Sequence, residues 1–459
     1  MKKLVIALLV LVLVAAALPL IGNSAIKTVI SEHTAMMQAN GVGVENEEVS
    51  SGYLSTTSHY ELILEDGDKL LTYISKHNQQ QIPTYLKGIL DGTKIGVDLT
   101  YSNIPIFSDI EVGIYPTSLS PEMENLFKKD DPVLYASLEK LLLNKTLYYQ
   151  INYSVSTETF HGSIRDINKA PVDFKDGSAA TVTLASAHFK GAGPLIAPNA
   201  INGTIKKLSA TFQESSELIS IAFDQITLDN TFNSLVEYRS SMRCKRMHLN
   251  FSNASNKGDI TLKNLAIDGD SSAKDNKIAG NSLGTIGTLT VNAPEFALKL
   301  DSIKADVTVD NLDREAFEAV HTALNRANSD SSVEASQAVM NTMGDLVSKG
   351  LFFNMREFSV DQITLNSDPS MKGFEHRAAI TVRPDSAFRR KSREHPMALL
   401  ENIDVDASLS FSKALYTHIA NEVPQTVLAS GFAKEDGDNI RFDITYKDDQ
   451  LLVNGKSLL

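Results

Sequence analysis

The segment Ile221–Leu228 reads IAFDQITL, with apolar side chains at Ile221, Phe223, Ile226 and Leu228. Alternation by two is typical of a strand that packs one face on a core, but here one extra residue separates Phe223 from Ile226. A shift of one residue turns every following side chain to the other face, so a bulge or a sharp bend must absorb the extra residue. The segment therefore predicts a bent strand whose apolar side chains share one side.

The same spacing recurs three more times along the chain. The first three copies begin at residues 221, 260 and 298, at intervals of 39 and 38 residues, which is typical of repeated supersecondary units. The fourth copy, at residues 358–365, shares the string DQITL with the first. The later copies are Ile260, Leu262, Leu265 and Ile267; Leu298, Leu300, Ile303 and Ala305; and Phe358, Val360, Ile363 and Leu365.

The sequence as a whole predicts an α+β fold that is predominantly β. In it, an N-terminal transmembrane helix precedes an extended curved antiparallel sheet, and the copies are the bent strands of that sheet. We interpret Ala180–Val309 as consecutive strands of that sheet, and an ordinary sandwich of bulged strands is the alternative. The fourth copy comes late because a helical hairpin is inserted at about residues 312–350. Its first helix has Asp313 as N-cap, and Gly350 follows its second helix as C-cap.

The rest of the chain divides into an N-terminal α+β region and a C-terminal hairpin. Asp131-Pro132 begins a predicted helix, and Tyr148–Val155 reads as a strand. Near the C-terminus, alternating apolar residues lead into a predicted turn at Lys447–Gln450 and a returning strand. We therefore expect an anchor at residues 1–25, an N-terminal region at 26–175, and a repeated-strand region at 176–459 with a soft boundary near Ala170–Gly177.

The first residues predict where the protein works. Lys2 and Lys3 precede a stretch from Leu4 to Gly22 without charged side chains, and roughly 20 apolar residues suffice to cross a bilayer. The lysines favour a cytoplasmic N-terminus and export of the body. We expect an uncleaved membrane anchor with an exported body; a cleavable signal peptide is the alternative.

Composition excludes several function classes. The 459 residues carry a formal net charge of −13, which argues against a nucleic-acid partner. No two of the ten histidines are three or four residues apart, so the helical metal-binding arrangement is absent from the sequence. Neither a nucleophile elbow nor a phosphate-binding glycine loop occurs. We therefore expect a protein that is not an enzyme and that uses no cofactor and no metal.

One cysteine and two basic clusters stand out. Cys244 lies between Arg243 and Lys245; cations can activate a thiol, but an incidental thiol is the simpler interpretation. The basic runs are either solvated strand edges and loops or an anion site for lipid headgroups or an acidic partner. The candidate anion-binding residues are Arg239, Arg243, Lys245 and Arg246, and Arg389, Arg390, Lys391 and Arg393.

Four segments resemble the YdgA family of bacterial envelope proteins, a group of unknown function. The similarity departs from the family where Ser51 replaces a common arginine and where Tyr101–Pro105 replaces a His-Gly-Pro element. The resemblance implies a bacterial inner-membrane-anchored, periplasm-facing protein able to self-associate, and it implies no catalytic residues. We expect a homodimer as one form of that self-association. The similar segments are Ser51–Ser55, Val307–Asp313, Leu346–Gly350 with Phe358–Leu365, and Leu428–Phe432 with Tyr446–Lys456.

Three functions follow as hypotheses. The first is a tethered, non-catalytic periplasmic scaffold that binds itself or other envelope proteins through long sheet edges and wide faces. The second is lipid binding or transfer in an apolar trough of the curved sheet, and the third, less favoured, is an exported hydrolase. The candidate apolar groove comprises Ile221, Phe223, Ile226, Leu228, Ile260, Leu262, Leu265, Ile267, Phe358, Val360, Ile363 and Leu365.

Overall fold

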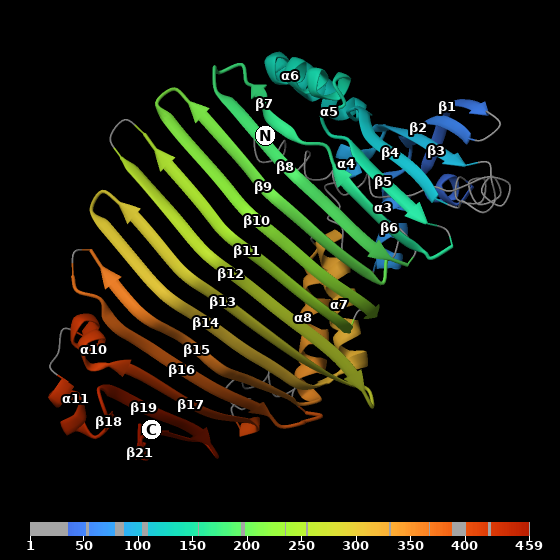
Figure 1. Cartoon of the computed structure of the whole chain (residues 1–459). Coiled ribbons are helices and arrows are strands. Elements are labelled where there is room, and N and C mark those ends of the chain that lie inside the picture. Colours follow the sequence, from blue (N-terminus) through green and yellow to red (C-terminus); the bar gives the residue numbers. More distant parts are fainter. Residues whose placement is uncertain are drawn as a thin grey trace. The chain divides into compact units, whose positions relative to one another are not determined.

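The computed structural model divides the chain into two compact units, which Figure 1 colours from blue to red along the sequence. The first comprises Met1–Phe232 and Phe251–Ala254, and the second comprises Asn233–Asn250 and Ser255–Leu459. The structure describes residues 35–51, 55–78, 87–102, 109–154, 156–193, 198–234, 236–253, 256–329, 332–366, 368–387, 401–420 and 424–458.

The expected anchor at residues 1–25 lies outside the described residues. Of the helices that the structure does describe, none has both the length and the apolar character needed to cross a bilayer.

The first unit is an antiparallel sheet with helices on it. Its strands pair in the order β1-β2-β3-β4-β5-β6-β8-β9-β10, and β6 and β7 pair one after the other with the same edge of β8. The elements are β1 (Val42–Ser51), β2 (Ser55–Leu64), α3 (Gly67–Asn78), α4 (Lys87–Leu90), β3 (Lys94–Ser102), β4 (Asp109–Ser118), α5 (Pro121–Asp130), α6 (Pro132–Leu143), β5 (Tyr149–Ser154), β6 (Thr159–Ile164), β7 (Ile167–Asp173), β8 (Ala179–Ala192), β9 (Ala200–Glu214) and β10 (Glu217–Ser234).

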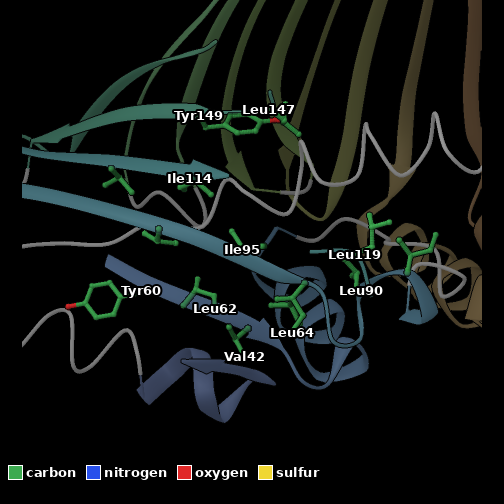
Figure 2. Packing of buried hydrophobic residues seen from close by; sticks show 14 of the residues in the cluster. Val42, Tyr60, Leu62, Leu64, Leu90, Ile95, Ile114, Leu119, Leu147 and Tyr149 are labelled. Atoms are coloured by element: carbon green, nitrogen blue, oxygen red, sulfur yellow. The ribbon is translucent and has the colours of Figure 1, made fainter. Parts of the chain in front are cut away.

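The core of the first unit forms on the helix-bearing face of β2–β5. Strict alternation along β2 buries every second side chain, and Figure 2 shows Leu62, Leu64, Ile95 and Ile114 in this core. The predicted helix at Asp131-Pro132 is confirmed as α6: the Asp131 carboxylate caps it by accepting the Leu134 N–H at 2.9 Å. The segment 170–177 lies within the β7–β8 hairpin.

The second unit is also one antiparallel sheet. Its strands pair in the order β12-β13-β14-β15-β16-β17-β19-β20-β21, with β18 on β19. The elements are β11 (Glu237–Ser252), β12 (Lys257–Lys274), β13 (Lys277–Ala293), β14 (Phe296–Asp313), α7 (Arg314–Ser329), α8 (Val333–Ser348), β15 (Leu351–Leu365), β16 (Met371–Val382), β17 (Ile403–Ser412), α10 (Lys413–Ala420), α11 (Pro424–Ser430), β18 (Lys434–Asp436), β19 (Asn439–Lys447), β20 (Gln450–Val453) and β21 (Lys456–Ser457).

The predicted local elements of the second unit are confirmed. The helical pair forms α7 and α8, the Asp313 carboxylate accepts the Ala316 N–H at 3.1 Å, and Gly350 has φ = +80°. The C-terminal hairpin is β19–β20, with a tight turn at Asp448 and Asp449, both left-handed. Within each unit the described strands form an open sheet without a second sheet stacked on it, so the sandwich alternative is wrong.

In the first three repeats the extra residue is left-handed, and no bulge shifts the register there. Gln225, Asn264 and Ser302 have φ of +53°, +55° and +55°. Pairing stops for that residue alone and resumes without a register shift, as between Lys263↔Thr288 and Leu265↔Ile286. One left-handed residue reverses which side the chain faces, so alternation restarts with apolar side chains on the original face.

The unpaired residues of neighbouring strands lie at the same level, although Gly287 and Asp361 do not have a positive φ. Opposite Asn264 lies Gly287 of β13, opposite Gly287 lies Ser302 of β14, and opposite Ser302 lies Asp361 of β15. A Cβ atom at Gly287 would lie 3.2 Å from the Cβ of Asn264, which is closer than ordinary contact and favours glycine there. In the first unit, Ser186 of β8 (φ = +49°) is at the level of Gln225. We call each such line of residues a reversal line.

A substitution series at the reversal line tests its conformation. We expect Ser302→Val to destabilise the chain by ~1–2 kcal/mol, because a β-branched residue resists positive φ, and Ser302→Gly to be neutral or stabilising by up to ~1 kcal/mol. Ser282→Val, at an exposed and regularly paired position of β13, is the control and should be nearly neutral. Urea unfolding monitored by circular dichroism gives the stabilities; equal effects of valine at residues 302 and 282 would contradict the interpretation.

Candidate functional site

The candidate groove residues lie in both units. Ile221, Phe223, Ile226 and Leu228 belong to β10 in the first unit, where each lies opposite a residue of β9. The other eight belong to β12 and β15 in the second unit, where β13 and β14 lie between them. The structure therefore assembles the second and fourth repeats into one surface with the third.

In the second unit the repeats align into four rows that cross the strands at right angles. Residues directly opposite in neighbouring strands share a face, and the reversal line separates the second row from the third. We call these residues the four apolar rows. They are Ile260, Val291, Leu298 and Leu365; Leu262, Leu289, Leu300 and Ile363; Leu265, Ile286, Ile303 and Val360; and Ile267, Ala305 and Phe358, with Gly284 between the first two of these.

Packing shows that the rows on the two sides of the reversal line point the same way. A single cluster joins Leu298 of the first row, Ile363 of the second and Val360 of the third with Leu415 of α10. Leu415 is only 2% exposed. Its helix begins after Ser412, whose hydroxyl accepts the Leu415 N–H at 3.1 Å. Helix α10 therefore covers the end of the apolar face near β15–β17.

The cover is incomplete toward the fourth row. Val360 and Ile363 are 4% and 8% exposed, whereas Ile267 and Phe358 of the fourth row are 42% and 37% exposed. Leu228, the corresponding residue of the first repeat in the other unit, is also 37% exposed. Side chains of this size bury themselves when they can, so a half-exposed apolar face is a surface suited to an apolar ligand.

A line of aromatic rings continues the apolar face across the C-terminal strands. Phe358, Phe374, Phe411 and Phe442 follow one another with ring centroids 5.6, 6.1 and 6.5 Å apart. Tyr416 of α10 lies 6.4 Å from the Phe442 ring. The sequence analysis did not assign Phe374 to the site, although it alternates with the strand period and could have been found by extending the rows to β16.

The basic cluster on β11 is engaged within the protein. Arg243 donates from Nη2 to both carboxylate oxygens of Asp268 at 2.8 Å, and this guanidinium holds the pKa of the Asp268 carboxyl below its ordinary value. Arg239, Lys245 and Arg246 are exposed on the same strand. The second cluster, Arg389, Arg390, Lys391 and Arg393, lies outside the described residues. The anion site therefore stays a prediction.

Cys244 is 3% exposed, and its thiol lies 3.3 Å from the Arg246 carbonyl oxygen. Burial keeps this thiol away from reagents in solution. Among the described residues no three His, Cys, Asp or Glu side chains converge as metal ligands.

A polar network in the first unit was missed by the sequence analysis. The Asp98 carboxylate lies 2.7 Å from His59 Nδ1, accepts the Tyr115 hydroxyl at 3.2 Å, and lies 3.6 Å from Lys145 Nζ. Burial raises the pKa of the Tyr115 hydroxyl. The groups come from β2, β3, β4 and the turn after α6, and together they fix the turn onto the sheet.

Glycines make room for this network. A Cβ atom at Gly96 would lie 2.5 Å from the Tyr115 ring, and one at Gly113 would lie 2.1 Å from the Tyr148 hydroxyl. The two tyrosine rings stack at 5.7 Å, and Arg165 lies over the Tyr148 ring at 4.5 Å. The only sequence signal was the placement of single glycines inside strands.

Comparison with known proteins gives one family. A family model described as "Bacterial protein of unknown function (DUF945)" matches residues 144–458. No curated protein and no solved structure matches the chain.

The Arg243–Asp268 pair predicts a dependence of stability on pH. Because the pKa of Asp268 is lower in the folded state than its ordinary value of 3.8, the pair stabilises the fold above that pH and is lost as the pH falls through the folded-state value. Both side chains are more than a third exposed, so we expect ~0.5 kcal/mol or less.

Unfolding in urea across a pH series from neutral to below 3.8 measures this contribution. Asp268→Asn should lose it and show a flatter acid limb than the wild type, whereas Glu295→Gln, in an exposed turn, should follow the wild type. Identical acid limbs for the wild type and Asp268→Asn would contradict the prediction.

Proposed function

The chain belongs to the bacterial family DUF945, whose function is unknown, and we propose that it is a non-catalytic envelope protein that holds hydrocarbon chains of lipids on its apolar sheet face. The observation that carries the proposal is the four apolar rows, which place repeats from β12 to β15 on one surface that α10 covers only in part. Such a face binds a ligand through its apolar surface area, and its side chains offer no polar group that could take part in a reaction.

The location of the protein is part of the proposal. The lysines and apolar stretch of residues 1–22 support an inner-membrane anchor with the body in the periplasm. The resemblance to the YdgA proteins supports the same placement. A tether of this kind would hold the apolar face near the bilayer from which lipid chains are taken.

A scaffold that assembles by strand addition has less support than lipid binding. Among the described strands, β1 is shown to pair with β2 alone. That strand carries exposed Glu45, Glu47 and Glu48, and charges on an edge strand discourage pairing with another chain. In the second unit the edge strand β21 has two residues, too short for a strong template.

Polar substitutions on the rows test the proposal. The double variant Leu265→Asn and Ile286→Asn places two amides in the third row, next to the reversal line, where both residues are half-buried. We expect phospholipid that co-purifies with the full-length protein in mild detergent, counted by mass spectrometry, to fall roughly tenfold, because an unpaired amide opposes an apolar chain.

The matched control is Lys263→Asn with Thr288→Asn, a directly opposed pair on the other face of the same two strands. It should retain wild-type lipid. Equal lipid loss in both double variants, or no stoichiometric lipid on the wild type, would refute lipid binding. A change from dimer to monomer in the third-row variant, with no change in lipid, would instead favour self-association through this face.

A further inference from the structure

A second apolar space lies in the first unit, between α6 and the sheet. Its cavity volume is about 60 Å³, and it opens to solvent. This is less than the roughly 300–1,000 Å³ of a whole small-molecule site and leaves room for the end of a hydrocarbon chain. Among the described residues that line it, Thr146 is the one polar residue. The lining residues are Pro116, Leu119, Leu138, Leu141, Leu142, Thr146, Leu147, Ile167, Ala170, Val172 and Val182.

The start of α6 is fixed to the β7–β8 hairpin by hydrogen bonds. The Asp131 carboxylate accepts the N–H groups of Leu134 at 2.9 Å and Lys175 at 3.0 Å. The Ser137 hydroxyl accepts the Asp173 N–H at 3.1 Å. Leu134 and Leu138, on the inner side of the helix, are buried in the core of the unit.

The end of α6 lies over the apolar space. Leu141 and Leu142 are only half-buried, and Leu143 is 79% exposed. A left-handed Lys145 ends the helix, and the N–H groups of Lys145 and Thr146 return to the carbonyls of Leu142 and Leu141. The chain then passes through Leu147, which Figure 2 shows in the same core cluster as Leu119. The terminal turn is therefore complete, and the space beneath it is not filled by the helix.

The lining chemistry selects the occupant. An apolar space of this kind is a poor site for water, which needs two or more polar partners. Its lining side chains lack dispersion contacts on the open side, and a hydrocarbon chain would supply them. The exposed Leu143, next to the lining residues Leu141 and Leu142, extends the apolar character to the surface of the helix end.

The space also joins the repeat pattern of the same unit. Val182 of the lining pairs with Ala210 of β9, and Ala210 pairs with Ile221, the first residue of the candidate groove. A row of apolar side chains thus leads from the space across β8 and β9 to β10. We propose that the space beneath α6 takes the end of one hydrocarbon chain of a lipid, with the rest of the lipid outside, an inference that rests on the proposed lipid binding.

Photo-crosslinking with full-length protein tests the site. The protein is reconstituted into vesicles of phosphatidylethanolamine and phosphatidylglycerol that contain palmitic acid bearing a diazirine in its chain, and adducts are mapped by peptide mass spectrometry. In the wild type we expect adducts on peptides of α6 and β7. Ala170→Phe should reduce these adducts roughly tenfold, because the ring fills the space from the sheet side.

Ala136→Phe, at an exposed position of the same helix, is the matched control and should label as the wild type does. Leu142→Phe fills the space from the helix side and should repeat the loss, and the thermal unfolding midpoint of each variant shows whether it is folded. Adducts on β12–β15 report the apolar rows separately and should persist in Ala170→Phe.

Labelling of β12–β15 without labelling of α6 and β7 in the wild type overturns this inference and leaves the proposed function intact. The same pattern is expected if a segment of the chain itself fills the space. Labelling of α6 and β7 without labelling of β12–β15 contradicts only the proposed role of the four apolar rows. Labelling of α6 and β7 that is unchanged in folded Ala170→Phe also overturns the inference.

Discussion

The structure of the strand repeats depends on one conformational constraint, the left-handed residue that lies at the unpaired level of β8, β10, β12 and β14. A left-handed residue that is not glycine costs about 1–2 kcal/mol, and a reversal on one strand alone would place its apolar side chains opposite polar ones. Because Asn264, Gly287 and Ser302 are all unpaired at one level, the leucines and isoleucines on both sides of the line stay opposite each other. The burial of apolar side chains along every row offsets the conformational free-energy cost of each left-handed residue.

On the opposite face of the sheet in the second unit, polar side chains of neighbouring strands lie opposite each other in the same way. The Lys304 ammonium contacts the Glu357 carboxylate at 2.5 Å and lowers the pKa of Glu357, and the Thr288 hydroxyl donates to Asp301 at 2.9 Å. These pairs are partly exposed and contribute little stability individually. Their effect is to leave this face polar, so that the sheet has one apolar face and one polar, solvent-exposed face.

Helices decide how much of each apolar face remains open. In the second unit Leu415 of α10 seals the rows over β15, and the fourth row is left half-exposed. In the first unit α6 is held by Asp131 and Ser137 at its start and leaves an apolar space beneath its end. Both arrangements keep apolar surface accessible inside a folded protein, which is the common basis of the two lipid-binding proposals.

Local sequence determined the elements. The caps at Asp131 and Asp313, the turn at Asp448–Asp449 and the skipped spacing of the repeats each follow from interactions within a few residues, and such signals are readable without the fold. The repeat also predicted that a bend keeps its apolar side chains on one face. Tertiary structure decided the rest: that left-handed residues and not bulges absorb the extra residue in the first three repeats, that Phe374 joins the rows, that Asp268 neutralises Arg243, and that α6 leaves a space over Ala170. Each of these depends on which residue of a distant strand or helix comes opposite, and that pairing is set by the packing of the whole sheet, which no local pattern records.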